Sequence, residues 1–436
     1  MKVMKFGGTS VGTAQRMKNM SALGADEGEA LVVLSAMSGT TNNLIEISDA
    51  VVAGKVDEAN SMLRLLEETY RNVAAELLSD LSLREEAARR LDTFFAQLRD
   101  CVSAPADELT QKSIVAYGER LSTNLVELYM LQEGMDVVLL DATDFMRTGA
   151  DGEPDEEYIR RHLGELLAAN PGHRTYLTQG FICLDHRGRI HNLQRGGSDY
   201  TASLIGAAID AEEIQIWTDI DGMHNNDPRF VENTSPVGEL HFEEAAELAY
   251  FGAKILHPTC VLPAKRSNIP VRLLNTMEPQ AKGTTIYNAP STRCIKAVAA
   301  KDSITAIKIK SSHMLLAYGF LRKVFEIFEK YRTPIDMITT SEVGVSVTID
   351  NCCNLDAICG ELSELGDVTV DRDMVIICVV GDLEWQNRGF EAEVVNALRD
   401  IPVRMISYGG SNYNISLLIR SSDKVEALKA LSSHLF

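Results

Sequence analysis

The chain of 436 residues is short of positive charge and has no long hydrophobic run. Its 42 lysines and arginines are outnumbered by 62 aspartates and glutamates, which gives a formal net charge of -20 at pH 7. A charge of that sign repels nucleic acids and anionic lipid, so neither a nucleic acid nor a membrane is an expected partner. No apolar stretch approaches the roughly 20 residues that cross a bilayer as a helix.

Cysteine pairing is also absent from the sequence. The eight cysteines form no C-x-x-C pair and have no metal-site spacing. Reduced, mostly buried thiols in a cytoplasmic protein are therefore expected, and a redox role for adjacent Cys352 and Cys353 is the less favoured alternative. The opening MKVMKF has the pattern of a core strand and not of a signal peptide.

Neither familiar phosphate-binding signature, G-x-x-x-x-G-K-S/T or G-x-G-x-x-G, describes the first glycine-rich loop. That loop does place Lys5 near the end of an apolar strand, just before Gly7, Gly8 and two hydroxyl residues. Glycines leave backbone N–H groups open to a ligand and the lysine adds charge, so the segment suits a polyphosphate. A plain strand-to-helix turn that uses glycine for positive φ is the alternative.

Further cations and acids follow other predicted strands. Arg195 precedes two glycines at the start of an apolar helix, whose positive dipole end favours an anion. Ser198 or Asp199 can cap this helix. Lys254 stands in the segment FGAKILHP, and WTDIDG places carboxylates after a buried strand. Together these groups indicate nucleotide chemistry.

Six motifs in a fixed order give the chain a family resemblance. They are KFGGTSV, SAMSGTTN, YGERLST, RGGSDYTA, WTDIDG followed by NDPR, and FGAKILHP. The set resembles the aspartate kinases of the amino acid kinase superfamily, over the whole chain, and the C-terminal part is most similar to the lysine-sensitive, monofunctional members. The resemblance implies ATP-dependent phosphorylation of the L-aspartate side-chain carboxylate to 4-phospho-L-aspartate, the first step of lysine, threonine and methionine biosynthesis.

Alternating strands and helices up to about residue 290 predict an α/β fold with a mainly parallel sheet covered on both faces. The resemblance implies the three-layer amino acid kinase fold. The expected strands are apolar runs at residues 31–34, 137–140, 174–178, 214–217 and 271–274. Residues 56–102 are charged and amphipathic, which predicts a helical insertion. Ligands are expected at the carboxyl ends of the strands.

An internal repeat follows residue 290. The segment TPIDMIT at 333–339 resembles IPVRMIS at 401–407, and each copy lies between an amphipathic helix and a strand. The family resemblance identifies the copies as α+β, ferredoxin-like ACT domains. The implied division is a catalytic domain at 1–290, a first ACT domain at 303–375 inserted in the second, and a second ACT domain formed by 291–302 with 376–436. Such paired domains predict a homodimer.

The chemistry of the reaction indicates which side chains matter. A carboxylate nucleophile is ionised at pH 7, so catalysis needs cations aimed at the phosphates rather than a general base. Lys5 and Lys254 are the catalytic candidates, and Asp199 is expected to orient them rather than ligate metal. A strand-edge lysine kept for solubility is the alternative for Lys5. ATP is the expected cofactor, with Mg²⁺ bridging its phosphates.

The substrate and nucleotide residues come from the resemblance. It implies that Arg195 holds the α-carboxylate of aspartate, which a guanidinium grips in bidentate fashion, and that Glu119 pairs with the ammonium group. A helix-face carboxylate paired with Arg120 is the alternative for Glu119. The remaining substrate candidates are Ser35, Thr41 and Ser198. The nucleotide candidates are Lys5, Gly7, Gly8, Thr218, Asp219, His224, Asp227, Arg229 and Lys254, and His224 stands where relatives commonly carry tyrosine.

A charge difference between the repeat copies predicts the effector. The first copy has Asp336 where the second has Arg404, so a cationic effector, lysine, is expected at the first. A turn cap is the alternative for Asp336. The expected effector residues are Met314, Gly319, Phe320, Leu321, Asp336, Thr340 and Ser341.

Two other functions remain open. One is another amino acid kinase of the glutamate or carbamate type, which does not explain the ACT-like tail. The other is an amino-acid sensor without catalysis. A bifunctional kinase-dehydrogenase is not expected, because these 436 residues show no second nucleotide fold with G-x-G-x-x-G.

Overall fold

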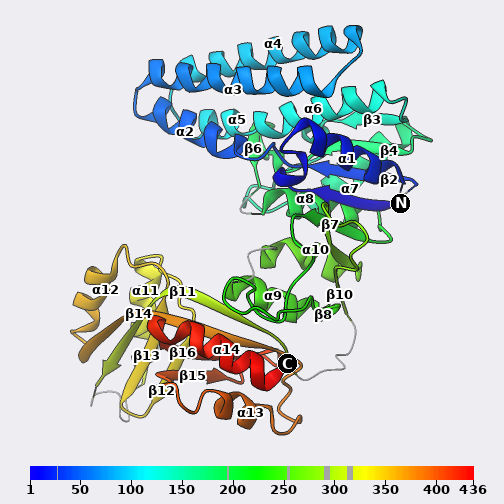
Figure 1. Ribbon diagram of the computed structural model, residues 1–436. Coiled ribbons are helices and arrows are strands. Elements are labelled where there is room, and N and C mark those ends of the chain that lie inside the picture. The colour runs from blue at the N-terminus through cyan, green and yellow to red at the C-terminus, as the bar shows by residue number, and fades with distance from the viewer. Residues whose placement is uncertain (27, 194–195, 253–255, 289–294, 312–317) are drawn as a thin grey trace. The chain divides into compact units, whose positions relative to one another are not determined.

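The computed structural model describes residues 1–436 except residues 27, 194–195, 253–255, 289–294 and 312–317 (Figure 1). The chain divides into two compact units. The first unit comprises residues 1–222 and 256–288, and the second comprises residues 223–255 and 289–436. Residues 223–255 thus group with the C-terminal part of the chain, whereas the predicted catalytic domain runs unbroken to residue 290.

The first unit is built on a mainly parallel sheet with the strand order β3-β4-β2-β1-β7-β9-β10. Neighbouring strands run parallel except β10, which is antiparallel to β9. The strands are β1 (Lys2–Phe6), β2 (Ala30–Leu34), β3 (Val137–Leu140), β4 (Thr175–Gln179), β7 (Ile214–Thr218), β9 (Val271–Asn275) and β10 (Thr284–Tyr287). The five strands expected from the apolar runs are therefore confirmed.

Helices cover both faces of this sheet. Helices α1 and α6 pack on one face, and α8 packs on the other, with α7 and α10 beside it. Figure 1 shows α3 and α4 outside α2, α5 and α6, which confirms the predicted helical insertion. The helices are η1 (Gly8–Val11), α1 (Ala14–Asp26), α2 (Thr40–Val52), α3 (Val56–Leu77), α4 (Leu81–Ser103), α5 (Glu108–Val115), α6 (Tyr117–Gln132), η2 (Ala142–Asp144), α7 (Glu156–Ala169), α8 (Gly197–Ala208), η3 (Pro258–Val261) and α10 (Leu262–Arg266), and a hairpin is formed by β5 (Ile182–Leu184) and β6 (Ile190–Asn192).

Side-chain alternation along β1 decides where its lysine points. Met4 and Phe6 are buried in the apolar cluster shared with the α1 and α6 helices. Successive residues of a strand face opposite sides of the sheet, so Lys5 projects toward the other face, where α8 begins. Burial of Met4 and Phe6 on one face of the sheet thus fixes the Lys5 ammonium group on the other face.

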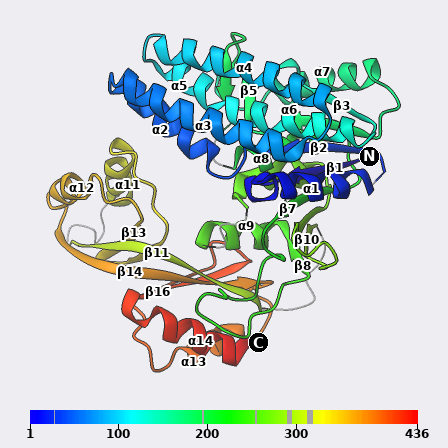
Figure 2. The ribbon, with the colours of Figure 1, turned by 45° about the horizontal axis from the view of Figure 1, so that its top comes forward.

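The second unit is built on an antiparallel sheet with the strand order β12-β13-β11-β14-β16-β15. Figure 2 shows β11 and β14 as long neighbouring strands, with α11 and α12 near one end and α13 and α14 near the other. The elements are β8 (Glu239–His241), α9 (Phe242–Phe251), β11 (Ile295–Lys310), α11 (Phe320–Lys330), β12 (Ile338–Ser341), β13 (Gly344–Ile349), α12 (Leu355–Leu362), β14 (Asp367–Gly381), α13 (Phe390–Ala397), β15 (Met405–Tyr408), β16 (Asn414–Arg420), η5 (Ser421–Asp423) and α14 (Lys424–Leu435).

Two apolar cores divide this sheet into halves. One core joins β13 and the later part of β11 to α11 and α12, and the other joins β16 and the later part of β14 to α13 and α14. Each long strand changes from one half to the other beside a residue of positive φ, Ser303 in β11 and Asp373 in β14. Ile295 pairs with Gly381, so the start of β11 joins the second half.

Candidate active site

A cavity of about 330 Å³ opens at the carboxyl ends of β1 and β2, beside the start of α8. This is the edge of the sheet at which ligands of open α/β folds gather. It is lined by Lys5, Gly8, Ser35, Ala36, Met37, Ser38, Gly39, Thr41, Glu119, Phe181, Gly196, Gly197, Ser198 and Asp199. The structure thus brings together seven predicted site residues from four separate motifs.

Lys5 is the cation of this cavity. Its side chain is largely buried, and Nζ lies 2.7 Å from Oδ1 of Asp199, in the first turn of α8. The carboxylate holds the ammonium group at the wall of the cavity, where a phosphate oxygen can replace water around it. The charge of the Asp199 carboxylate is therefore already matched by the lysine.

The glycine-rich loop approaches the neighbouring loop too closely for a side chain. A Cβ atom on Gly8 would lie 2.9 Å from the carbonyl oxygen of Ala36. Among the described residues, neither Gly7 nor Gly8 has a positive φ, so the alternative of a turn that needs glycine for that conformation is wrong. Close approach of two backbones is the physical reason for glycine here.

The N-cap residue of α8 is not one of the two residues predicted from the sequence. Gly196, with φ of 74°, is the N-cap residue, and no side chain caps the helix. The prediction that Ser198 or Asp199 provides the cap is wrong, because both lie inside the first turn. The uncapped first turn leaves N–H groups at the cavity, and such a helix end favours an anion.

Glu119 carries a buried carboxyl group, one oxygen of which has no hydrogen-bond partner. It lies in the first turn of α6 and is 3% exposed. Oε1 accepts a hydrogen bond of 3.2 Å from the backbone N–H of Ala36, whereas Oε2 has no hydrogen-bond partner. Burial raises the pKa of Glu119 to about 8, although backbone N–H groups and Lys5 oppose that rise. An ammonium group in the cavity would satisfy the free oxygen and favour the ionised form.

Comparison with known proteins identifies the family. The model of the amino acid kinase family matches residues 1–275, and that of an ACT domain matches residues 377–435. The chain is 33% identical over 451 residues to lysine-sensitive aspartokinase 3 of Escherichia coli (strain K12), and the alignment covers 100% of this chain and 99% of the relative. The chain belongs to the aspartokinase family.

Solved structures of an aspartokinase share its fold. The structure of E. coli aspartokinase III in complex with aspartate and ADP (R-state) is similar with a TM-score of 0.84, and that with lysine and aspartate (T-state) with 0.82. Each is 33% identical, and the matches cover 100% of this chain and 100% and 99% of those chains. The resemblance inferred from the motifs is confirmed. The chain is an aspartate kinase of amino-acid biosynthesis with ATP as its phosphoryl donor.

The other nucleotide candidates of this aspartokinase lie outside the cavity lining. Thr218, at the end of β7, donates to Asp219 across 3.2 Å in the first unit. Three further candidates, His224, Asp227 and Arg229, belong to the second unit, where Arg229 pairs with Asp227 at 2.6 Å and Nδ1 of His224 lies 2.9 Å from Oγ1 of Thr234. The pKa of Asp227 is lowered, because the effect of burial, which would raise it, is outweighed by hydrogen bonds from Arg229. Arg195 and Lys254 lie outside the described residues.

Some lining residues of the aspartokinase pocket were not among the candidates. Ala36, Met37, Ser38 and Gly39 belong to SAMSGTTN, from which only Ser35 and Thr41 were selected, so the motif itself was the signal. Phe181 has positive φ, and its backbone N–H donates to Oγ1 of Thr201 across 2.9 Å. No motif marked Phe181, because only the packing of two strands and a helix brings it to the cavity.

The predicted effector carboxylate of the aspartokinase is already paired. The Asp336 side chain is 1% exposed, and Oδ1 lies 2.6 Å from Nζ of Lys301 and 2.7 Å from the hydroxyl of Tyr250. It therefore binds side chains and does not cap a turn. Gly319 and Phe320 lie at the start of α11, Leu321 follows, and Thr340 and Ser341 lie in β12, whereas Met314 is outside the described residues.

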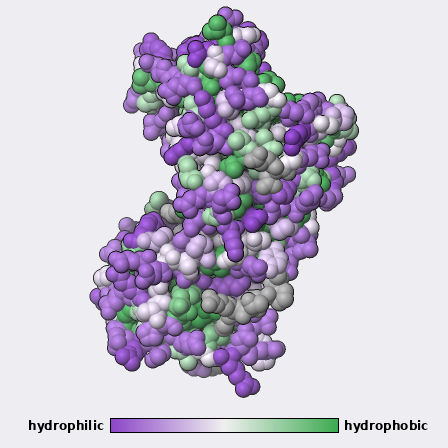
Figure 3. All heavy atoms as spheres, turned by 45° about the vertical axis from the view of Figure 1, so that its right-hand side comes forward, coloured by the Kyte–Doolittle hydropathy of each residue, from purple (hydrophilic) through white to green (hydrophobic). Residues whose placement is uncertain are grey.

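Among the described residues, no cluster of histidine, cysteine, aspartate and glutamate has the geometry of a metal site, and no helix is long and apolar enough to cross a membrane. The seven described cysteines are all free thiols. Figure 3 shows a surface on which hydrophilic residues predominate.

Proposed function

We propose that the cavity at the ends of β1 and β2 is the site where the γ-phosphoryl group passes from ATP to aspartate. The observation that supports this proposal best is the unfilled Glu119 carboxyl group in the same cavity as the Lys5 ammonium group. One group fits the ammonium of an amino acid and the other fits a phosphate. An amino-acid carboxylate bound between them is placed to meet the phosphorus atom in line.

The reaction needs no removal of a proton from the nucleophile, because the aspartate carboxylate is already ionised at pH 7. The side-chain carboxylate oxygen of aspartate forms a bond to the γ-phosphorus, while the bond between that phosphorus and the bridging oxygen breaks and ADP departs. Lys5, with Lys254 assisting, offsets the charge that builds on the transferring oxygens. The N–H groups of the Gly7–Gly8 loop cradle the phosphates, and Asp199 keeps Lys5 aimed at them.

The substrate side of the site selects aspartate. Arg195 binds the α-carboxylate in bidentate fashion, Glu119 binds the ammonium group, and Ser35, Thr41 and Ser198 supply hydroxyl hydrogen bonds. The nucleotide side uses the glycine-rich loop together with Thr218, Asp219, His224, Asp227, Arg229 and Lys254.

Mg²⁺ is proposed to bridge the phosphates of ATP. Magnesium keeps several waters and binds one or two carboxylates plus substrate phosphates, so it requires no cage of protein ligands. The described residues fit that mode. The Asp199 carboxylate next to the cavity already pairs with Lys5, so the ion would be held mainly by the phosphates of ATP and by water. When bound, the ion neutralises charge on the phosphates.

Lysine is the proposed effector, at Asp336 and the residues around it, and the E. coli T-state structure described above contains lysine. Paired ACT domains are proposed to form a homodimer. Free thiols and the absence of paired cysteine spacing support a reducing, cytoplasmic compartment.

The test of the catalytic proposal is turnover with trapping of the acyl phosphate. The protein is incubated with ATP, Mg²⁺ and L-aspartate, and hydroxylamine converts the product to a hydroxamate. We expect hydroxamate with aspartate and little with L-glutamate or carbamate. No hydroxamate from any acceptor would favour the amino-acid sensor, and a preference for glutamate or carbamate would favour another amino acid kinase.

A further inference from the structure

A second cavity, of about 590 Å³, lies in the half of the second unit formed by α13, α14, β15 and β16. Its wall consists of the bend in β14, the loop before β15 and the end of β16. The charged and hydroxyl residues of the wall include three arginines, Arg372, Arg404 and Arg420, and the two serines Ser421 and Ser422. The volume lies in the range of small-molecule sites.

Three guanidinium groups at one cavity are unusual in a chain with a net charge of -20. Arg404 is paired, because its Nε lies 2.9 Å from Oδ2 of Asp371. Within the described part of the chain, no carboxylate oxygen lies within 4.0 Å of the guanidinium nitrogens of Arg372 or Arg420. Asp373 also lines the wall, so three positive charges face two negative ones. The cavity therefore has a local excess of positive charge and room for an anion.

The internal repeat relates this cavity to the Asp336 cluster with the charges reversed. Asp336 and Arg404 occupy equivalent places in TPIDMIT and IPVRMIS. Asp336 pairs with Lys301 of β11, and Arg404 pairs with Asp371 of β14, each close to the positive-φ residue at which its long strand changes halves. The charge of the third member of each cluster is reversed too. In the first copy it is Asp350, which follows β13 and lies 3.0 Å from Lys301. In the second copy it is Arg420, at the end of β16.

We infer that the Arg372–Arg404–Arg420 cavity binds a small anion that carries carboxylate or phosphate groups. Guanidinium groups bind the oxygens of both in bidentate fashion, and two of the three are available without breaking an ion pair. Ser421 and Ser422 add hydroxyl donors where β16 ends. The inference concerns a site separate from the catalytic cavity and from the Asp336 cluster, and it does not depend on the effector bound at either.

Isothermal titration of the full-length protein with inorganic phosphate and with succinate, at constant ionic strength, tests this inference. We expect saturable binding of at least one probe to the wild-type chain and to Lys5→Met, in which the catalytic cation is removed. Binding of phosphate alone identifies a phosphate-bearing ligand, and binding of succinate alone identifies a dicarboxylate.

The variants Arg372→Gln and Arg420→Gln should each weaken that binding at least tenfold. Arg420→Lys, which keeps the charge and loses the bidentate geometry, should weaken it less and guards against misfolding of the glutamine variants. Arg399→Gln is the matched control, because Arg399 is exposed in the same half, pairs with Asp400 and does not line the cavity. No saturable binding to the wild type, or equal binding to Arg420→Gln and Arg399→Gln, would overturn the inference.

Discussion

At the scale of single residues, burial gives Glu119 its chemistry. A carboxyl group in water ionises below pH 7, but inside this cavity it loses hydration, and the backbone N–H groups that favour the ionised form, that of Ala36 among them, do not make up for this loss. The group therefore stays protonated near neutral pH until a cation arrives. In the proposed role of Glu119, binding of the substrate ammonium group would release that proton.

Binding of aspartate at pH 7 should release up to about one proton from Glu119, because the substrate ammonium stabilises the carboxylate. Titration calorimetry in buffers of different ionisation enthalpy measures this release. Glu119→Gln should bind aspartate more weakly and release no proton. Equal proton release by the variant and the wild type would assign the titration to another group.

The same pKa predicts a pH dependence of stability. The carboxyl group of the unfolded chain ionises above about pH 4.5, whereas the folded chain keeps the proton to about pH 8. The folded state binds more protons in this window, so its stability falls as pH rises from about 4.5 to about 8. Glu119→Gln should lose that part of the pH dependence, as denaturant unfolding at several pH values would show.

In its proposed role, Lys5 acts on the transition state more than on the ground state. Lys5→Met should lower kcat by about 10²- to 10³-fold, the usual loss for one preorganised electrostatic group. Asp199→Asn should lower kcat less, because the lysine remains. Steady-state kinetics with varied ATP and aspartate measure both. A Lys5→Met variant with normal kcat would remove Lys5 from the catalytic role.

At the scale of elements, the start of η1 is positioned by contact with the loop after β2. Gly8→Ala places Cβ against the backbone of Ala36 and Ser38 and should raise the KM for ATP, since the cradle must move. Gly164→Ala, in α7, is the matched control because its Cβ meets nothing within 4 Å. The control should keep full activity and gain roughly 0.5–1 kcal/mol of stability.

The Asp336 cluster couples β11, α9 and the loop before β12 within the second unit. A cationic effector must compete with Lys301 for the Asp336 carboxylate. Asp336→Ala should therefore raise the half-inhibitory lysine concentration at least tenfold, whereas Lys301→Met should lower it. Rates at varied lysine, each divided by the uninhibited rate of the same variant, measure both shifts. Shifts in the same direction would contradict this competition.

Parallel titrations with threonine and methionine show whether lysine is the effector. In the predicted lysine site, the Asp336 carboxylate binds the side-chain ammonium group of the effector. Neither threonine nor methionine has a side-chain ammonium group. Inhibition by threonine or methionine alone would place the effector elsewhere.

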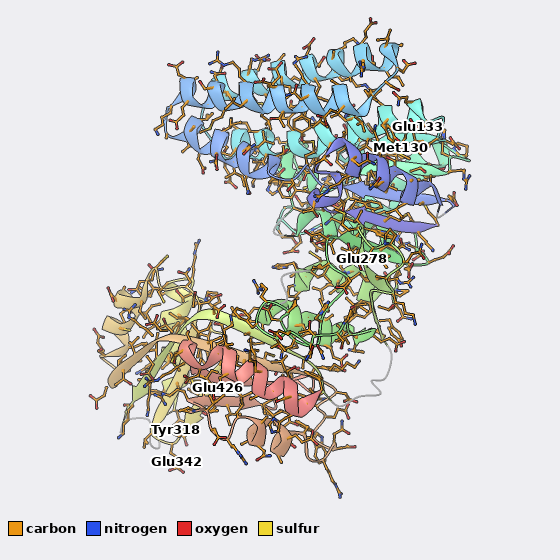
Figure 4. All side chains as sticks on the ribbon, viewed as in Figure 1. Met130, Glu133, Glu278, Tyr318, Glu342 and Glu426 are labelled. Carbon is orange, nitrogen blue, oxygen red and sulfur yellow. The ribbon has the colours of Figure 1, made fainter. Side chains whose placement is uncertain are left out.

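At the scale of the whole molecule, the proposed homodimer would form through exposed side chains of the second unit. Figure 4 shows Tyr318 and Glu342 projecting from the part of this unit that carries α11 and β12. Tyr318 is fully exposed, and exposed aromatic side chains are enriched at protein interfaces.

Sedimentation should therefore give a mass of two chains, and Tyr318→Asp should weaken the dimer. Leu81→Asp is a control, because Leu81 is an exposed apolar residue of the first unit. A monomeric wild type, or equal weakening by both variants, would contradict assembly through the second unit.

Much of the fold could be predicted because its signals are local. A buried parallel strand such as Ala30–Leu34 is a continuous apolar run, and α3 shows its helical period in its own residues. The helix cap at Gly196 was missed, because serine and aspartate nearby are the usual caps and only the backbone shows that glycine takes the place. Phe181 was missed because nothing in its neighbourhood of the sequence marks a ligand site.

The sequence by itself determined the family, the order of strands and helices, and half of the residues that line the cavity, since each depends on short motifs and apolar periods. Only the tertiary structure decided that burial raises the pKa of Glu119, that Asp336 is matched by Lys301, and that three arginines share one cavity. These properties depend on burial and on charges far apart in the chain, and both exist only once distant segments are packed together.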